Sequence, residues 1–313
     1  MLFLVLIILK IKIMLSIIIP FYKLTFFEAT VQSLANQTDK RFKVYIGDDA
    51  SPEDPTKLLE KYKGKVDFIY HKFEDNLGSI SLTKQWERCI ALSNNEEWIM
   101  ILGDDDVLGK NVVKAFYANL LEIEKEGINV VRFASQIIDE TTNTTSKVFV
   151  NPKLENAACF YSRRYLGLVR SSLSEHVFRR ESYLKYSFRN YPLAWHSDDY
   201  AWIQFAENKP VLAINDAKVM IRVSAISLSG MDTNLNEKEK AESMFYMDLV
   251  KHNLKLFKTE DRFKFLRRAE VSLNKQRKLK IEEWGILFLG YCRNFDFLIF
   301  LNFVKRFIKS LKQ

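Results

Sequence analysis

The stretch "LSIIIPFYK" (residues 15–23) decides how the chain is expected to fold. Its apolar, β-branched residues follow one another without alternating with polar ones, which indicates a strand that is buried on both faces. Such a strand belongs in the middle of a sheet that carries helices on both sides. The apolar run ends at Pro20 and Tyr22, where side chains can reach a ligand beyond the strand.

Similar apolar runs alternate with helix-like segments along the first half of the chain. We predict strands over residues 15–21, 42–46, 66–70, 98–102 and 130–133. Apolar spacing and helix-forming composition predict helices over residues 26–36, 54–62, 79–93 and 110–126. The repeated strand and helix order predicts the α/β class, with a doubly wound, mostly parallel sheet flanked by helices.

Residues able to contact a ligand stand at the ends of three predicted strands. They are Pro20 and Tyr22, then Asp48 and Asp49, and then Asp104, Asp105 and Asp106 in "ILGDDDVLG" (101–109). Ligands bind beyond the carboxyl ends of the strands in such sheets, so we expect these groups to converge. Three adjacent aspartates repel one another, and a hard cation with oxygen ligands, Mg²⁺ or Mn²⁺, relieves that repulsion. Magnesium usually shares protein carboxylates with substrate phosphates, so the pattern also predicts a phosphate-bearing ligand.

A simpler interpretation of these aspartates stays open. Aspartate is common in turns and at helix starts, where it accepts hydrogen bonds from free backbone N–H groups. Capping alone accounts for one of the three adjacent aspartates, and a turn with Ser51 and Pro52 accounts for Asp48 and Asp49.

Taken together, these motifs resemble those of glycosyltransferase family 2, the nucleotide-sugar-dependent transferases with the GT-A fold. The family's "xSIIIPxYN", "VDDGSxD", "NxG" and "LDxDD" have counterparts here in "LSIIIPFYK", "IGDDASPED", "NLGS" (76–79) and "LGDDDVL". Their order and spacing agree over residues 14–125. The resemblance implies transfer of a sugar from a nucleotide-diphosphate donor, expected to be UDP-linked, with Mg²⁺ or Mn²⁺ as cofactor. It also implies a glycan or lipid-linked acceptor in cell-surface polysaccharide synthesis.

The resemblance assigns nucleotide-sugar binding to Pro20, Tyr22, Asp48, Asp49, Asn76, Gly78, Asp104 and Arg222. All three of Asp104, Asp105 and Asp106 are candidate metal ligands. When the motifs are aligned on "DVL", the family's first metal-motif Asp falls on Gly103 and its second on Asp105, which is therefore the first candidate. Asp104 is expected to replace the lost carboxylate towards the ribose. Asp106 is expected to support the site or to cap the helix from Lys110.

Inverting transfer needs a base that takes the proton from the acceptor hydroxyl, and a carboxylate can do this. The family places an "ED" pair near a helix start, and "HSDDYAW" (196–202) resembles it, with Asp198 for the Glu and Asp199 for the Asp. Asp199 is the expected base, although the pair can also serve as a helix cap. We interpret His196 as an exposed loop residue and Trp202 as a core residue.

Two further segments bear on the donor site. Residues 80–90 lack the family's common "ARNxG" and run about one residue long, so the donor-sugar contacts have no clear counterpart. Arg222 in "MIRVSAISLS" resembles the "yRxHxxSxS" segment that follows the base in relatives. An arginine there can hold a phosphate, and a surface salt bridge is the alternative.

The C-terminal part of the chain is strongly basic. Residues 251–313 hold sixteen Lys or Arg against six Asp or Glu, whereas the whole chain has a net charge of +8. Basic residues mixed with aromatic and aliphatic ones favour peripheral association with an anionic inner leaflet. The open alternative is a helical subdomain with a solvated basic face. No nucleic-acid module is visible, so no nucleic-acid partner is expected.

We expect three parts: an apolar N-terminal extension (1–13), a GT-A glycosyltransferase domain (14–230) and a helical basic C-terminal extension (231–313). The first part is a poor signal peptide, and a translation start at Met14 is an open alternative. Three widely spaced cysteines fit a reducing compartment, which favours the cytoplasm, with the inner face of the cell membrane as a place of attachment.

Two other functions stay open. A nucleotidyltransferase also uses carboxylate-held Mg²⁺, but it usually has a phosphate loop rich in Gly, Arg or Lys near its first strand, and "PFYKLTFFEA" offers none. A non-catalytic, membrane-associated scaffold that keeps the nucleotide-sugar fold is the second alternative, because Gly103 replaces an expected carboxylate.

Overall fold

The computed structural model describes residues 14–227 and 234–311, so the expected extension over residues 1–13 lies outside the described residues. The described residues form two compact units. One comprises residues 14–190 and 201–227, and the other comprises residues 191–200 and 234–311.

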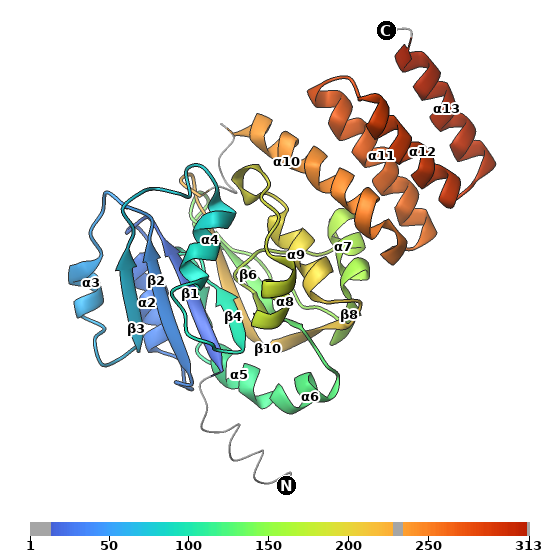
Figure 1. The fold of residues 1–313 in the computed structure, drawn as a ribbon. Helices are drawn as coiled ribbons and strands as arrows, with labels where there is room; N and C mark the ends of the chain where they lie inside the picture. Colours follow the sequence, from blue (N-terminus) through green and yellow to red (C-terminus); the bar gives the residue numbers. More distant parts are fainter. Residues whose placement is uncertain (1–13, 228–233, 312–313) are drawn as a thin grey trace. The chain divides into compact units, whose positions relative to one another are not determined.

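The first unit is built on a ten-stranded sheet (Figure 1). Its strands are β1 (Leu15–Phe21), β2 (Phe42–Asp48), β3 (Phe68–Lys72), β4 (Trp98–Ile101), β5 (Val107–Leu108), β6 (Val130–Asp139), β7 (Thr144–Thr145), β8 (Leu154–Asn156), β9 (His176–Arg179) and β10 (Pro210–Val223). The strand order is β3-β2-β1-β4-β9-β6-β10-β5, with β7 on β6 and β8 on β10. β1 lies parallel to both β2 and β4, with Leu15 in register with Phe42 and Trp98. The ends of β1, β2 and β4 therefore lie at one edge of the sheet.

Helices cover both faces of this sheet. They are α2 (Phe27–Ala35), α3 (Thr56–Glu60), α4 (Leu82–Ile90), α5 (Val112–Ala118), α6 (Leu120–Lys125), α7 (Ala157–Tyr165), α8 (Arg180–Tyr186) and α9 (Ser197–Phe205), the last of which begins in the second unit. Phe21 packs on Phe27 of α2, with ring centroids 4.6 Å apart, so α2 covers one face. A Cβ at Gly47, on the opposite face, would lie 2.3 Å from the Cys89 sulfur of α4. Gly47 thus allows α4 to approach the other face closely.

The predicted α/β class with flanking helices is confirmed, with differences in detail. The sheet is mixed, because β9 lies antiparallel between β4 and β6. β9 and the fourteen-residue β10 fall in the region that the sequence pattern left irregular. The strand expected over residues 66–70 to be buried on both faces is instead the partly exposed edge strand β3. The helix expected over residues 110–126 is divided at Asn119 into α5 and α6.

The second unit is mainly helical. It contains a 3₁₀ turn (Pro192–Ala194), α10 (Leu235–Asp248), a π-helical turn (Leu249–Asn253), a 3₁₀ turn (Leu254–Leu256), α11 (Thr259–Gln276), α12 (Ile281–Arg293) and α13 (Phe297–Leu311). α11 packs against α10 and α12, and α13 packs against α12. Within the described part of the chain, no helix combines the length and the apolar character needed to cross a bilayer.

Candidate active site

Asp104 joins the end of β4 to the end of β1. Its Oδ2 accepts hydrogen bonds from the backbone nitrogens of Tyr22 (2.7 Å) and Lys23 (2.8 Å). Thr30 donates to the backbone oxygen of Asp104 (3.1 Å), which adds α2 to the same junction. Burial raises the pKa of the Asp104 carboxyl to about 6, although the two backbone N–H groups favour its charged form. The expected convergence of strand ends is therefore present for β4 and β1.

Asp106 is tied to two other parts of the first unit. Its Oδ1 accepts from the backbone nitrogen of Arg222 on β10 (2.8 Å), and its Oδ2 accepts from the Ser174 hydroxyl (2.5 Å). The same Ser174 oxygen accepts from the backbone nitrogen of Gly103 (3.0 Å). Burial, with the charge of Asp105 nearby, raises the pKa of Asp106 to about 7. Asp106 does not cap the following helix, because α5 begins at Val112 without a side-chain cap.

Asp105 differs from its two neighbours. In the described part of the chain, its carboxylate accepts a hydrogen bond from its own backbone N–H and none from another residue. Burial raises the pKa of Asp105, and the positive charges of Arg222 and Lys23 oppose that rise. A Cβ at Gly103 would lie 3.0 Å from Oδ1 of Asp105 and from Oδ2 of Asp106, so a larger side chain would press on both carboxylates.

These three carboxylates are therefore unequal as metal ligands. Among the residues that the structure describes, no group of three or more His, Cys, Asp or Glu side chains is placed to hold a metal ion. Asp105 alone of the three keeps its carboxylate oxygens clear of other residues' donors. One or two carboxylates suffice for Mg²⁺ when substrate phosphates supply the remaining oxygens, so the residues present fit a cation that binds together with a diphosphate.

Asp48 and Asp49 hold the loops that follow β2 and β3. Asp48 is fully buried and accepts from the backbone nitrogen of Ser51 (2.7 Å) and the Tyr70 hydroxyl (2.6 Å). Asp49 accepts from the backbone nitrogens of Leu77 (2.8 Å) and Gly78 (2.9 Å), and it pairs with Arg88. The predicted turn of Asp48 with Ser51 is therefore present. The contacts of Asp48 and Asp49 with a nucleotide remain a prediction.

The "NLGS" segment (76–79) is shaped by these contacts. A Cβ at Gly78 would lie only 2.4 Å from Oδ2 of Asp49, so this position needs a glycine for the loop to approach the carboxylate. Asn76 accepts from the backbone nitrogen of Ser79 (2.9 Å) and closes the turn. Pro20 is partly buried at the end of β1, and Tyr22 beyond it is exposed. The assignment of Pro20, Tyr22, Asn76 and Gly78 to nucleotide-sugar binding stays a prediction.

Arg222 lies beneath the aspartate motif. Its Nε donates to the backbone oxygen of Asp105 (2.9 Å), its guanidinium pairs with Glu140, and its Cζ lies 4.3 Å from the ring centroid of Phe26. The side chain is only 9 % exposed. The alternative interpretation of Arg222 as a surface salt bridge is therefore right about an acidic partner but wrong about the position at the surface. Arg222 positions the backbone of the motif, and its assigned contact with a phosphate stays a prediction.

The two candidates for the base belong to the second unit. Asp198 and Asp199 lie in the first turn of α9, and Asp199 is only 2 % exposed. His196 Nδ1 lies 2.8 Å from Oδ2 of Asp199, and the imidazole stacks on Phe245, with ring centroids 4.7 Å apart. His196 is thus a partner of the candidate base, and its interpretation as an exposed loop residue is wrong. Trp202 is 1 % exposed, which confirms its place in the core.

Backbone strain precedes this pair of aspartates. Leu193, Ala194 and His196 all have positive φ angles, 56°, 52° and 67°, although none is a glycine. Such conformations are costly for these residue types and cluster at functional sites. The segment that presents Asp198 and Asp199 is therefore held by its packing in a conformation that its residues do not prefer.

Several residues of these arrangements were missed by the sequence analysis. Ser174 and Glu140 carry no motif; Ser174 contacts Asp106 and Glu140 contacts Arg222 only because β9, β6 and β10 pair in the sheet. Lys23 stands directly after the strand-end motif, so its position was visible, but its electrostatic interaction with Asp105 was not. No periodic signal could have found these partners, because their contacts span large distances along the chain.

Known proteins are similar to this chain in sequence pattern and in fold. The family model described as "Glycosyl transferase family 2" matches residues 16–185. No curated protein sequence matches the chain. S. aureus TarS 1–349 in complex with UDP-GlcNAc is similar with a TM-score of 0.61 and 15% identity, over 90% of this chain and 80% of that chain. The UDP complex of the same protein gives 0.57 and 14%, over 88% and 80%.

A longer S. aureus TarS structure has a TM-score of 0.59 and 15% identity, over 91% of this chain and 50% of that chain. The chain thus spans about half the length of that protein. At such low identity the likeness shows the fold, and it confirms the predicted GT-A architecture.

Proposed function

Because the chain belongs to glycosyl transferase family 2, and is therefore a glycosyltransferase, we propose that it is an inverting, metal-dependent enzyme. Its donor is a nucleotide-diphosphate sugar, UDP-linked, and its acceptor is a glycan or a lipid-linked glycan of cell-surface polysaccharide synthesis. The observation that supports the proposal is the difference between the three aspartates, since Asp105 is the one whose carboxylate accepts no hydrogen bond from another described residue.

The donor pocket in this proposal lies over the ends of β1, β2 and β4. Pro20 and Tyr22 line the space for base and ribose, with Asn76 and Gly78 in the loop beside it. Carboxylates accept hydrogen bonds from base N–H groups and sugar hydroxyls. Asp48, Asp49 and Asp104 are already hydrogen-bonded within the protein, so any contact that they make with the donor uses their remaining acceptor capacity.

Asp105 would hold Mg²⁺ or Mn²⁺ together with the donor phosphates, with Asp104 and Asp106 stabilising the motif on either side. The ion would neutralise charge that develops on the leaving diphosphate. Arg222 fixes the backbone of Asp105, and Lys23 adds a second positive charge near the same carboxylate. These two cations favour the ionised form of Asp105, which is the form that a metal needs.

Asp199 is the proposed base, with Asp198 beside it. A carboxylate can take the acceptor hydroxyl proton as the oxygen attacks the anomeric carbon. His196, which contacts Asp199, fixes the orientation of that carboxylate and acts as a positioning residue. The strained backbone before α9 supports a functional role for this segment.

The neighbours support the class of donor in this proposal, because S. aureus TarS was crystallised with UDP-GlcNAc and with UDP. The sugar that this chain transfers is left open by that likeness. We extend the proposal to the place of action, the inner face of the cell membrane, where a lipid-linked acceptor would lie.

Calorimetric titration with UDP, in Mn²⁺ and in EDTA, tests the metal site. Wild-type protein should bind UDP at least tenfold more tightly with Mn²⁺, and Asp105→Asn should remove this difference. Asp67→Asn, a change of an exposed aspartate on the approach to β3, is the matched control and should behave as wild type. UDP binding that ignores both the metal and the Asp105 change would overturn the metal-dependent proposal and favour a scaffold.

A second experiment tests the base separately from donor binding. Asp199→Asn should retain the affinity for UDP but lower kcat by roughly 10²-fold or more, since general base catalysis contributes about 10²–10⁴-fold. Unchanged turnover of a UDP-sugar in this variant would move the base to another residue.

A further inference from the structure

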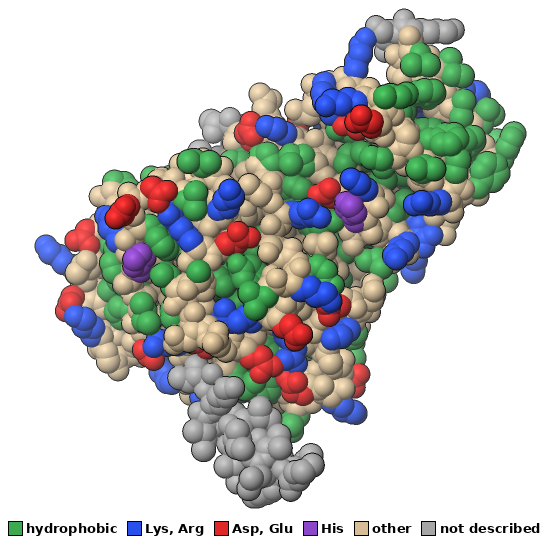
Figure 2. Space-filling view, in the orientation of Figure 1, with side chains coloured by type: hydrophobic (Ala, Val, Ile, Leu, Met, Phe, Trp, Pro, Cys, Tyr) green, Lys and Arg blue, Asp and Glu red, His purple; other side chains and the backbone are tan. Residues whose placement is uncertain are grey.

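Helices α12 and α13 present a continuous apolar surface. We call it the apolar face, and it consists of Phe288, Leu289, Phe295, Phe297, Leu298, Leu301, Ile308 and Leu311, all of them exposed. The rings of Phe288 and Phe295 both lie against Phe300, with centroids 5.7 and 5.6 Å away, so the two helices and their connection form one surface. Figure 2 shows apolar side chains gathered over this part of the second unit.

The opposite side of α13 is attached to the rest of the second unit. Phe303 is 2 % exposed and packs on Tyr291, with ring centroids 4.5 Å apart. Arg306 donates to the buried carboxylate of Glu270 on α11, from Nε to Oε1 (2.7 Å) and Oε2 (3.1 Å) and from Nη2 to Oε2 (2.9 Å). These contacts fix the rotation of α13 about its axis. Leu301 and Ile308 lie on a different side of α13 from Phe303. The contacts of Phe303 and Arg306 therefore hold these two side chains outward.

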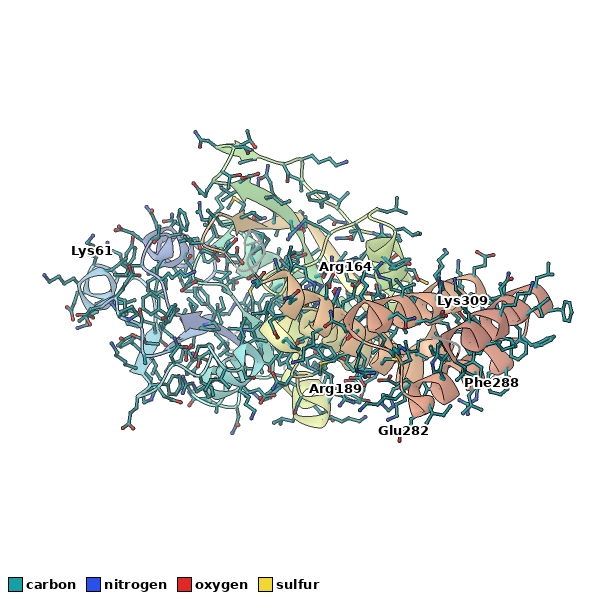
Figure 3. All side chains as sticks on the ribbon, turned by 90° about the horizontal axis from the view of Figure 1, so that it is seen from above. Lys61, Arg164, Arg189, Glu282, Phe288 and Lys309 are labelled. Carbon is teal, nitrogen blue, oxygen red and sulfur yellow. The ribbon has the colours of Figure 1, made fainter. Side chains whose placement is uncertain are left out.

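Apart from Asp296, which lies between Phe295 and Phe297 just before α13, the charges along this helix are positive. α13 carries Lys305, Arg306 and Lys309 and no acidic residue. Arg306 is used by Glu270, whereas no ion pair of Lys305 or Lys309 occurs among the described residues. Figure 3 labels Lys309 of α13 and Phe288 of α12, and both side chains are exposed. An apolar stripe flanked by unpaired lysines is the pattern of a helix that lies in a membrane interface.

We propose that the apolar face docks on an anionic lipid bilayer, with α13 lying in the interface. The fifteen residues of α13 would extend about 22 Å at 1.5 Å per residue, which is short of the hydrocarbon thickness of about 30 Å. Insertion along the surface therefore fits the helix better than crossing. Lys305 and Lys309 attract the headgroups while the aliphatic and aromatic side chains enter the acyl boundary. A second copy of the chain is a poorer occupant, because the same lysines would meet lysines of equal charge.

This inference rests on the proposed function in one respect: lipid binding would bring the transferase to a lipid-linked acceptor. Lipid binding needs neither donor nor metal, so a vesicle experiment can fail while the UDP titration succeeds, or the reverse. The two proposals are therefore tested independently.

Flotation of the full chain with vesicles provides the test. Wild type should float with phosphatidylcholine vesicles that contain phosphatidylglycerol, and at least tenfold less protein should float with phosphatidylcholine alone or at high salt. Leu301→Asp with Ile308→Asp should lower the floated fraction at least tenfold. Leu184→Asp changes a leucine on α8 of the first unit that is 71 % exposed, and it should float as wild type.

Light scattering and thermal unfolding of the same variants complete the experiment. Because both substituted side chains are exposed, the double variant should unfold at the wild-type temperature, so that a loss of flotation reports docking. A wild type that does not float, or a double variant that floats equally well, would overturn the proposal. Self-association that the double variant abolishes, without any flotation, would instead make the face an interface between copies of the chain.

Discussion

The carboxylate of Asp104 lies 2.7 Å from the backbone nitrogen of Tyr22, eighty-two positions earlier in the sequence. Through this hydrogen bond the end of β4 determines the position of the chain where it leaves β1. The acidic motif and the strand-end motif are thus parts of one structure. Any change to Asp104 should affect Tyr22 as well as the neighbouring Asp105.

Loss of the Asp104 carboxylate should destabilise the first unit. Asp104→Ala leaves the N–H groups of Tyr22 and Lys23 without this acceptor, which we expect to cost about 1–3 kcal/mol in free energy of unfolding. Asp104→Asn keeps an acceptor oxygen at the same place and should lose less than half as much. Urea unfolding of the two variants measures the difference, and equal losses would contradict the assigned role of Oδ2.

The raised pKa of Asp106 predicts a pH dependence of the metal-free protein. Its folded pKa of about 7 lies above the unfolded value near 3.8, so its contribution to stability is fully present below pH 3.8 and is lost as the pH rises through 7. Asp105 and Glu175 raise this pKa, whereas the Ser174 hydroxyl and the Arg222 N–H lower it. Asp106→Asn should flatten the decline in unfolding temperature between pH 5 and pH 8 in EDTA. The same slope in the variant and in wild type would refute the assignment.

Gly78 should tolerate no side chain. Gly78→Ala would place a Cβ 2.4 Å from Oδ2 of Asp49, so the "NLGS" loop must shift and lose its hydrogen bonds to that carboxylate. We expect a loss of about 1–3 kcal/mol in stability, together with weaker UDP binding. Urea unfolding and UDP titration measure the two effects. UDP affinity equal to that of wild type would separate this loop from the donor site.

Two glycines of α12 offer a matched pair for the packing of the second unit. Gly290→Ala would bring a Cβ to 2.4 Å from Cδ2 of the buried Leu266, and we expect it to cost about 1–3 kcal/mol. Gly285 is exposed, and a Cβ there would meet no heavy atom of the described residues within 4 Å beyond its own helix backbone, so Gly285→Ala should stabilise the helix by up to about 1 kcal/mol. Thermal unfolding of both variants checks the pair. Stabilisation by both would show that α11 and α12 pack less closely than found here.

His196 should affect turnover more than donor binding. His196→Ala removes the contact with Asp199 and should lower kcat by about tenfold at an unchanged KM for the donor, less than the roughly 10²–10⁴-fold of the base itself, because the carboxylate remains. His196→Asn keeps an N–H donor and tolerates the φ of 67°, so it should restore part of the loss. Steady-state kinetics separates kcat from KM. A rise in KM alone would assign His196 to donor binding.

Local patterns were enough to predict much of the first unit. Continuous apolar runs identified β1, β2, β4 and the start of β6, because burial on both faces leaves a signature within each segment. The polar residues beyond those strands marked the edge of the sheet where a ligand can bind. The strand β9 was missed, since four residues between two neighbours carry too little pattern of their own.

The sequence by itself determined the α/β class, the order of the motifs and the placement of carboxylates at strand ends. Only the tertiary structure decided which of these carboxylates accept hydrogen bonds from distant parts of the chain. Asp106 accepts a hydrogen bond from Arg222, 116 positions away, and Asp104 accepts one from Tyr22 through Oδ2, whereas no other residue in the described part of the chain donates to the Asp105 carboxylate. Each aspartate follows the same strand and has the same chemistry, and they differ only in the donors that distant segments bring to them when the sheet assembles.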